Sequence, residues 1–206
     1  MLDTPDTLAA EIRLLLEQGD EQAAVTRAVE GYGPEVMGFL QAMVRDPDAA
    51  DDVFSEVCED VWRGLSSFRW EAPLRAWVYT IARHAALRHF RRGHERRRRP
   101  LDDALAVGLV AEMRTRTRTW ARTEARTAVD RLREQLTPEE RALLVLRLDR
   151  KLAWSDIAQV MSAPEGETLS AEQARKESAM LRKRFERVKE RLKALAKAEG
   201  LLSDDG

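Results

Sequence analysis

Few residues in this sequence interrupt a helix, and none of its patterns predicts a β-strand. The 206 residues include only 10 glycines and 7 prolines, and no apolar-polar alternation extends over the length of a strand. Charged residues make up 34% of the chain, above the usual quarter, while 44% of residues are apolar, enough to build a core. This composition predicts an all-α fold.

Cysteines and long apolar runs are also scarce. The single cysteine, Cys58, excludes an internal disulfide, and its apolar neighbours favour a buried thiol. No uncharged run approaches the roughly 18 residues of a membrane span, and the acidic N-terminus lacks the apolar segment of a signal peptide. We therefore expect a cytoplasmic protein without membrane insertion.

Signs of catalysis are missing as well. The sequence has no glycine-rich phosphate loop and no nucleophile paired with a base, and its paired acids lie on a predicted surface helix. His84, His89 and His94 are surrounded by arginines and have no thiol or carboxylate cluster beside them. We predict no enzyme activity, no metal and no cofactor.

Charge is strongly segregated, although the formal net charge is only -1. Residues 46–60 contain seven acids and no base, whereas residues 68–99 contain ten arginines, two glutamates, two tryptophans, two phenylalanines and one tyrosine. One interpretation is two partners, a basic protein surface and a polyanion. The alternative is that the two charged helix faces pair with each other.

Apolar residues at helical spacing predict several helices in the first half. The first ends at Gly19, the second ends near Glu30 before a Gly-Tyr-Gly-Pro segment, and a third extends to a stop at Asp46. A helix over residues 51–65 should bury one face and expose an acidic one. Pro73 suits the first turn of the next helix. Its inward stripe is Leu74, Val78, Ile81 and Ala85, and Tyr79, Arg83 and Phe90 lie opposite.

The second half begins after a polar, partly helical linker. We place a first domain at 1–92, the linker at 93–129 and a second domain at 130–206. Thr137 with Glu140, and Ser170 with Gln173, have the spacing of capping boxes at helix N-termini. A short helix, a loop and a long basic helix from Ser170 to about Ala198 predict a helix-turn-helix.

These motifs, in this order, resemble a bacterial RNA polymerase sigma factor of the sigma-70 family, of the compact extracytoplasmic-function type. The first half resembles sigma region 2 through YGPEVMGFL, DAADDVFSEVCEDVWRGLSSF and FRWEAPLRAWVYTIARHAALRHFRR. The second resembles sigma region 4 through LTPEERALLVLRLDRKLAWSDIAQVM and LRKRFERVKERL. The resemblance implies two small helical domains, a region 2 bundle and a region 4 helix-turn-helix.

The resemblance also implies partners, namely core RNA polymerase and promoter DNA, and leaves an anti-sigma factor open. In the family, the acidic helix docks on a basic coiled coil of the polymerase. The corresponding residues are Asp51, Asp52, Glu56, Asp60 and Trp62. The next segment reads and melts the minus-ten element, with a loop at 68–73 for a displaced base. The residues implied there are Phe68, Arg69, Trp70, Glu71, Arg75, Trp77, Tyr79, Arg83, His84, Arg88 and Arg91.

For the minus-thirty-five element, the resemblance implies that the last helix enters the major groove of duplex DNA. The residues implied are Arg175, Lys176, Arg182, Lys183, Arg184 and Arg187. The chain departs from the family at Trp70 and Pro73, where small residues are usual, and in the long connection SAPEGETLS before the basic helix. We expect Trp70 to present an exposed ring plane in its loop.

Two other function classes remain open. A helix-turn-helix regulator would bind duplex DNA through residues 137–198 without polymerase and use the first half for dimerisation or sensing. An interaction protein would bind only polymerase or another regulator. Binding to promoter duplex by the chain alone favours the first alternative, and absence of DNA binding even with polymerase favours the second.

Overall fold

Helices make up all the regular structure of residues 5–92 and 132–201, which are the residues that the computed structural model describes. The predicted all-α fold is therefore confirmed for this part of the chain. The predicted linker lies outside the described residues. In chain order the elements are α1 (Pro5–Glu17), α2 (Glu21–Val44), α3 (Pro47–Gly64), the 3-10 helix η1 (Leu65–Ser67), α4 (Leu74–Arg92), α7 (Pro138–Leu144), the π-helix η2 (Val145–Asp149), α8 (Trp154–Ser162) and α9 (Ala171–Ala198).

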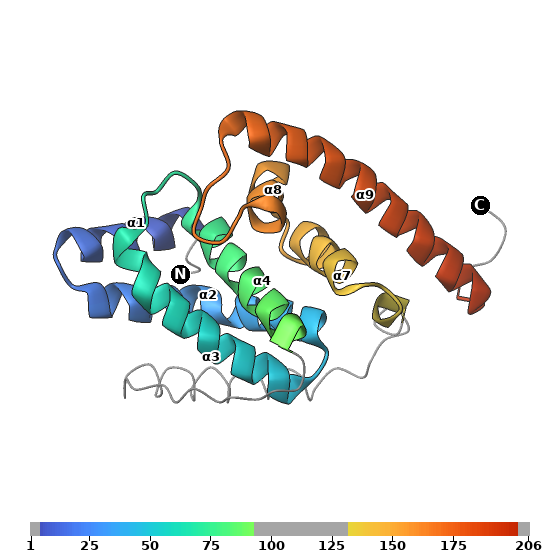
Figure 1. Ribbon diagram of the computed structural model, residues 1–206, viewed down its shortest axis with the longest axis horizontal. Helices are drawn as coiled ribbons and strands as arrows, with labels where there is room; N and C mark the ends of the chain where they lie inside the picture. Colours follow the sequence, from blue (N-terminus) through green and yellow to red (C-terminus); the bar gives the residue numbers. More distant parts are fainter. Residues whose placement is uncertain (1–4, 93–131, 202–206) are drawn as a thin grey trace.

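The first four helices form a bundle in which α1 packs on α2, and α2, α3 and α4 pack on one another (Figure 1). Its core contains the buried rings of Phe39, Phe54 and Tyr79. The rings of Phe39 and Tyr79 meet edge to face with centroids 5.3 Å apart, an arrangement that aromatic pairs prefer. This packing holds α4 against α2.

Helix α2 corrects one prediction, because it runs without a break through the Gly-Tyr-Gly-Pro segment. A proline inside a helix removes one hydrogen bond and costs about 3 kcal/mol. Pro34 is exposed, while Tyr32 and Val36 on either side of it are buried and offset that cost. Gly31 allows α1 to approach closely, because a Cβ there would overlap the side chain of Leu8.

Helix α3 begins at Pro47 rather than at the predicted Asp51. The carboxylate of Asp46 accepts hydrogen bonds from the backbone N–H groups of Asp48 and Ala49, which makes Asp46 the N-cap. Proline is favourable at the first helical position because its missing N–H needs no partner there. Asp46, predicted to end the preceding helix, is therefore also the residue at which α3 starts.

Helix α4 is buried on two sides, whereas the sequence pattern predicted one. It packs against α2 and α3, and also against α8 from the second half. Its fully buried alanines permit this close approach, while Ile81 of the predicted inward stripe is only half-buried. The buried alanines are Ala76, Ala82, Ala85 and Ala86.

Both predicted capping boxes are present in the second half. The hydroxyl of Thr137 accepts from the backbone N–H of Glu140, whose carboxylate in turn accepts from the backbone N–H of Thr137. Ser170 and Gln173 make the same reciprocal pair at the start of α9. Each box supplies partners for backbone donors that a helix N-terminus leaves unpaired, so these helices begin where the sequence predicts.

We expect Glu140→Gln to lower the free energy of unfolding by about 0.5 to 1 kcal/mol at neutral pH, and by less in acid. Burial alone would raise the pKa of Glu140, but hydrogen bonds from Thr137 and Arg191 lower it below its ordinary value. A carboxylate with a lowered pKa stabilises the fold above its unfolded pKa and loses that contribution as the pH falls through its folded pKa. Glutamine keeps the capping geometry and removes the charge.

Urea unfolding of both proteins at about pH 7 and about pH 3 measures this difference. An equal loss of stability at both pH values would contradict the role of the Glu140 charge.

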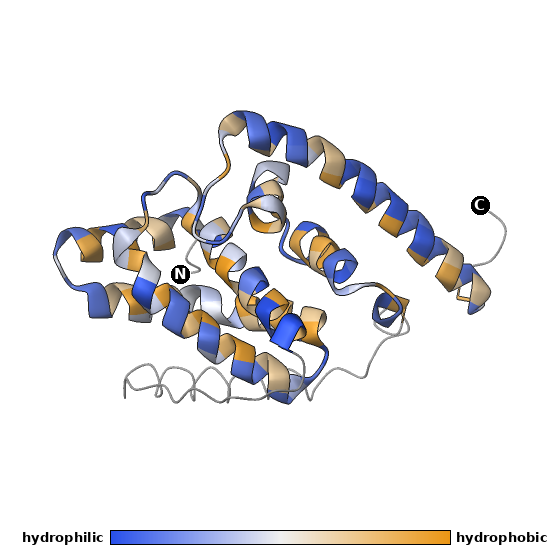
Figure 2. Ribbon diagram, viewed as in Figure 1, coloured by the Kyte–Doolittle hydropathy of each residue, from blue (hydrophilic) through white to orange (hydrophobic). Residues whose placement is uncertain are grey.

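Helices α8 and α9 form the predicted helix-turn-helix layout. The rings of Trp154 and Phe185 meet edge to face with centroids 5.6 Å apart, and the Ser178 hydroxyl donates to the carbonyl of Trp154 at 2.9 Å. Apolar residues of α9 lie toward the rest of the fold and its outer side is largely hydrophilic (Figure 2). The long basic helix is thus packed by one face and open on the other.

The two halves share an interface that the sequence did not predict. The buried guanidinium of Arg141 in α7 donates to the carbonyls of Ala42 and Met43 at the end of α2, at 2.6 and 2.8 Å. It also donates to the carbonyl of Leu136 at 2.5 Å. A bare helix C-terminus has unpaired carbonyls, so α7 supplies donors that α2 lacks. The second half is therefore held against the first by polar bonds as well as by packing.

Candidate nucleic-acid interface

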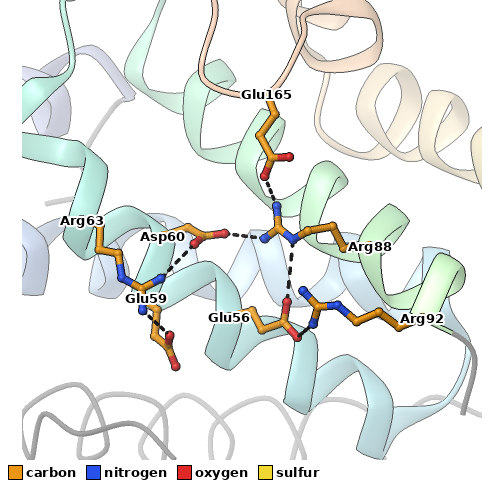
Figure 3. Close-up of polar contacts among 7 residues, drawn as sticks. All are labelled: Glu56, Glu59, Asp60, Arg63, Arg88, Arg92 and Glu165. Carbon is orange, nitrogen blue, oxygen red and sulfur yellow. Dashed lines mark hydrogen bonds and ion pairs between the residues drawn. The ribbon is translucent and has the colours of Figure 1, made fainter. Parts of the chain in front are cut away.

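A cluster of ion pairs joins the acidic face of α3 to the basic face of α4 (Figure 3). The Arg88 guanidinium contacts the carboxylates of Asp60 and Glu56 from α3 and of Glu165 from the second half. Arg92 contacts Glu56 at 2.7 Å. We call Glu56, Asp60, Arg88, Arg92 and Glu165 the Arg88 cluster. Pairing between the two charged faces, left open by the sequence, is therefore present.

The predicted polymerase-binding residues differ in exposure. Asp51 is only 7% exposed, so little of its side chain is available to a partner in this structure. It precedes the buried Phe54 by three residues and the buried Cys58 by seven, so helical spacing places it on the inner side of α3. Asp52 is half-buried, and Trp62 is 37% exposed.

An aromatic loop, residues 68–73, joins η1 to α4. The ring of Phe68 lies 5.2 Å from that of Trp70 and 4.9 Å from that of Trp77, centroid to centroid. Trp70 has a φ of 58°, a left-handed conformation that is rare outside glycine and asparagine. It is half-buried rather than exposed as predicted, because Phe68 and the Arg13 guanidinium lie against it.

Beside this loop is a cavity of about 250 Å³. Its walls combine aromatic rings with polar groups, which suits a flat ligand that also forms hydrogen bonds, such as a nucleobase. Gly64 allows the end of α3 to lie close to the Trp77 ring, since a Cβ at residue 64 would lie 3.0 Å from that ring. The lining includes Asp60, Phe68, Glu71, Trp77, His84 and the segment 165–168.

The predicted DNA-binding cations of α4 are mostly engaged within the protein. Arg75 donates two hydrogen bonds to Glu35 at 2.8 and 2.6 Å, and this pairing raises the pKa of Arg75. Arg83 donates to Glu139 of α7 at 3.0 Å. Arg91, by contrast, is exposed.

Tyr79 does not lie on an exposed face of α4, as the predicted DNA-facing stripe required. Its side chain is fully buried against Phe39, and burial raises the pKa of its phenol. The pattern failed here because α4 is covered on two sides, so a residue opposite the inward stripe still lies in the interior.

The predicted duplex-binding residues lie along α9. Arg175, Lys176, Lys183 and Arg187 are exposed and Arg184 is half-buried. The guanidinium of Arg182 lies over the Trp154 ring at 5.7 Å from its centroid. This cation–π contact supports the packing of α8 on α9.

Sequence patterns missed the residues of the second half that contact the first. Glu139, Arg141, Glu165 and Thr168 lie in a helix start and a loop, where no periodicity singles them out. Their roles depend on partners far away in the chain, such as Glu71 for Thr168 at 2.6 Å. A long loop with two glutamates was the available signal.

Within residues 5–92 and 132–201, no three His, Cys, Asp or Glu side chains gather in a way that could hold a metal. His94 of the histidine set lies outside these residues. No helix in the same residues is long and apolar enough to cross a membrane.

The profile of the family "Sigma-70 region 2" matches residues 28–98, a span that contains α3, the aromatic loop and α4. The chain is 29% identical over 160 residues to the RNA polymerase sigma-H factor of Pseudomonas aeruginosa, which covers 73% of this chain and 81% of that protein.

Two further relatives are named as ECF RNA polymerase sigma factors. The chain is 30% identical over 122 residues to the ECF RNA polymerase sigma factor SigM of Mycobacterium tuberculosis, covering 59% of this chain and 58% of that protein. It is 28% identical over 159 residues to the ECF RNA polymerase sigma-E factor of Escherichia coli, covering 73% of this chain and 81% of that protein.

Proposed function

Because the chain belongs to the sigma-70 family, among its extracytoplasmic-function members, we propose that it binds core RNA polymerase and directs promoter-specific initiation. The observation that supports this most is the arrangement within the stretch matched to region 2. An acidic helix, the aromatic side of the cavity and a row of arginines lie side by side there, and residues 165–168 of the second half complete the cavity wall. The chain then acts as a non-catalytic initiation factor in the cytoplasm.

The chemistry of the region 2 surface suits melted DNA. Unpaired bases expose flat faces that stack on aromatic rings, and arginines neutralise the phosphates that connect them. The cavity beside Phe68 and Trp77 offers a place for one displaced base, and Glu71 and His84 at its edge offer hydrogen-bond partners. Arg69 and Arg91, both exposed, extend the phosphate-binding surface on either side.

For the second half, we propose recognition of duplex DNA at the minus-thirty-five element by α9. Five exposed cations of the predicted set, Arg182 included, and an open outer face suit a helix that enters the major groove. In this proposal residues 1–92 act as region 2, residues 130–206 as region 4, and the linker allows both to reach one promoter.

Transcription with purified core polymerase tests the proposed function. Sheared genomic DNA from the organism that encodes the chain is transcribed with and without the protein, and the transcripts are sequenced to find their start sites. We expect a set of starts that depends on the protein and shares two upstream elements. Absence of a stable complex with core polymerase, together with binding of duplex DNA by the chain alone, would instead favour the helix-turn-helix regulator.

The double substitution Arg182→Ala with Arg184→Ala should lower transcription from these promoters about tenfold, because it removes two cations from the duplex-binding helix. Since Arg182 also lies over Trp154, thermal unfolding of the variant must be compared with the parent chain. Lys189→Ala with Lys193→Ala removes the same charge from the C-terminal part of α9 and serves as the control. Equal losses in both variants would contradict the assignment.

A further inference from the structure

The loop between α8 and α9 lies on the region 2 surface. Figure 1 shows this loop, residues 163–170, descending from α9 toward the first half of α4. The carbonyl of Ala163 lies 3.0 Å from Nε2 of His84, and the Thr168 hydroxyl donates to Glu71 at 2.6 Å. Between these contacts, Glu165 meets Arg88 (Figure 3). The loop therefore contacts three of the residues assigned to minus-ten DNA.

The loop has a defined conformation of its own. The Gln159 side chain donates to the carbonyl of Glu167 at 3.2 Å and accepts from the backbone N–H of Leu169 at 2.9 Å. Gly166 has a φ of 79°, which favours glycine, and the N–H of Glu167 closes a turn onto the carbonyl of Pro164. A preformed loop places Glu165 on Arg88 at a lower entropic cost than a flexible one.

The contacts of the loop imitate those of a DNA strand. The planar guanidinium of arginine makes charge-assisted hydrogen bonds to a carboxylate in the same way as to a phosphate. Residues 165–168 also form one wall of the cavity in which a displaced base would lie. Glu165 and a backbone phosphate cannot occupy the same position on Arg88 together.

Contacts outside the loop also hold the second half against the first. The ion pair between Arg83 and Glu139 is largely shielded, with side chains 13% and 25% exposed. Arg141 joins α7 to the end of α2. Separation of the two halves would thus free Arg83 from Glu139 and remove Glu165 from Arg88, which would keep its contacts with Asp60 and Glu56. Both arginines are among the residues proposed to contact minus-ten DNA.

From these contacts, we propose that the α8–α9 loop is an intramolecular competitor of single-stranded promoter DNA, with Glu165 in the place of a backbone phosphate on Arg88. The inference rests on the proposed function. In the free chain the loop keeps the minus-ten surface covered, and the surface becomes available when the second half moves away. The long connection before the basic helix then has a role that a tight turn would not supply.

The test compares Glu165→Gln with Glu167→Gln in the full chain. Both substitutions remove one negative charge from the same exposed loop. Of these two glutamates, only Glu165 forms an ion pair within the part of the chain that the structure describes. The probe is a fluorescein-labelled, 30-nucleotide single-stranded DNA of random sequence, followed by anisotropy at low ionic strength. Because Glu165 is 60% exposed, we expect Glu165→Gln to bind about three- to fivefold more tightly than the parent chain. Glu167→Gln should match the parent.

The outcomes separate this inference from the proposed function. Equal binding of DNA by the parent chain and both variants, or an equal gain in both variants, overturns the competitor role and leaves the proposed function intact. If none of the three chains binds single-stranded DNA or core polymerase, the proposed function fails and the inference fails with it. Both substitutions lie in an exposed loop, and circular dichroism of each variant is the control for folding.

Discussion

Arg141→Met is expected to lower the free energy of unfolding by about 3 kcal/mol, the largest loss of stability among the substitutions proposed. The guanidinium donates to three backbone carbonyls, and the residue as a whole is only 7% exposed. Methionine retains the apolar stem but leaves the carbonyls of Ala42, Met43 and Leu136 without these donors. An unsatisfied buried acceptor costs about 1 to 3 kcal/mol, and water that reaches the opened site would recover part of the sum.

Urea unfolding followed by far-ultraviolet circular dichroism measures this loss. Arg133→Met is the matched control, because Arg133 makes a two-point ion pair with Asp149, with nitrogen to oxygen distances of 3.1 and 3.2 Å, near the surface of the same half. Such an exposed pair contributes about 0.2 to 1 kcal/mol. If the two variants lose the same stability, Arg141 does not have the structural role assigned to it.

Replacing Asp52 and Glu56 by lysine is expected to weaken binding to core polymerase about a hundredfold, or about 2.7 kcal/mol. The proposed partner surface is basic, so each reversal turns an attraction into a repulsion. Glu56 also pairs with Arg88 and Arg92, so its reversal removes two internal contacts. Thermal unfolding therefore has to be measured beside the affinity.

A control of equal charge separates position from net charge. Glu21→Lys with Glu30→Lys makes the same change on exposed positions of α2. Fluorescence titration of labelled chain with core polymerase, at low and at physiological salt, measures both variants. Equal weakening by the two pairs would refute the docking role of α3. A loss that shrinks as salt rises would support it, because salt screens exposed charges.

The Arg88 cluster suggests how the two binding activities are connected. Glu56 and Asp60, two of the residues proposed to contact polymerase, form ion pairs with Arg88 and Arg92 in this structure. A basic polymerase surface would compete for these carboxylates and leave the arginines more available for phosphate. By linkage, each ligand would then increase the affinity for the other.

Local rules explain which features of the fold were predictable. The capping boxes at Thr137 and Ser170 act over three residues, so the start of α7 and of α9 followed from residue types alone. The break predicted in α2 failed because burial of Tyr32 and Val36 outweighed a proline penalty, and burial is a tertiary quantity. The burial of Asp51 and Tyr79 was not predictable for a related reason, since their exposure depends on which sides of α3 and α4 are covered.

The order of residues along the chain was by itself enough to determine an all-α fold, the acidic and basic segments, the positions of two capping boxes and the resemblance to sigma factors. Tertiary structure alone decided that Arg88 lies between acids of α3 and a glutamate 77 residues away, and that Arg141 reaches a carbonyl 98 residues away. Caps and periodicity act within a few residues, whereas these contacts exist only because α8 packs on α4 and α7 on α2. The aromatic loop was visible in the sequence, but its covering by the α8–α9 loop was not.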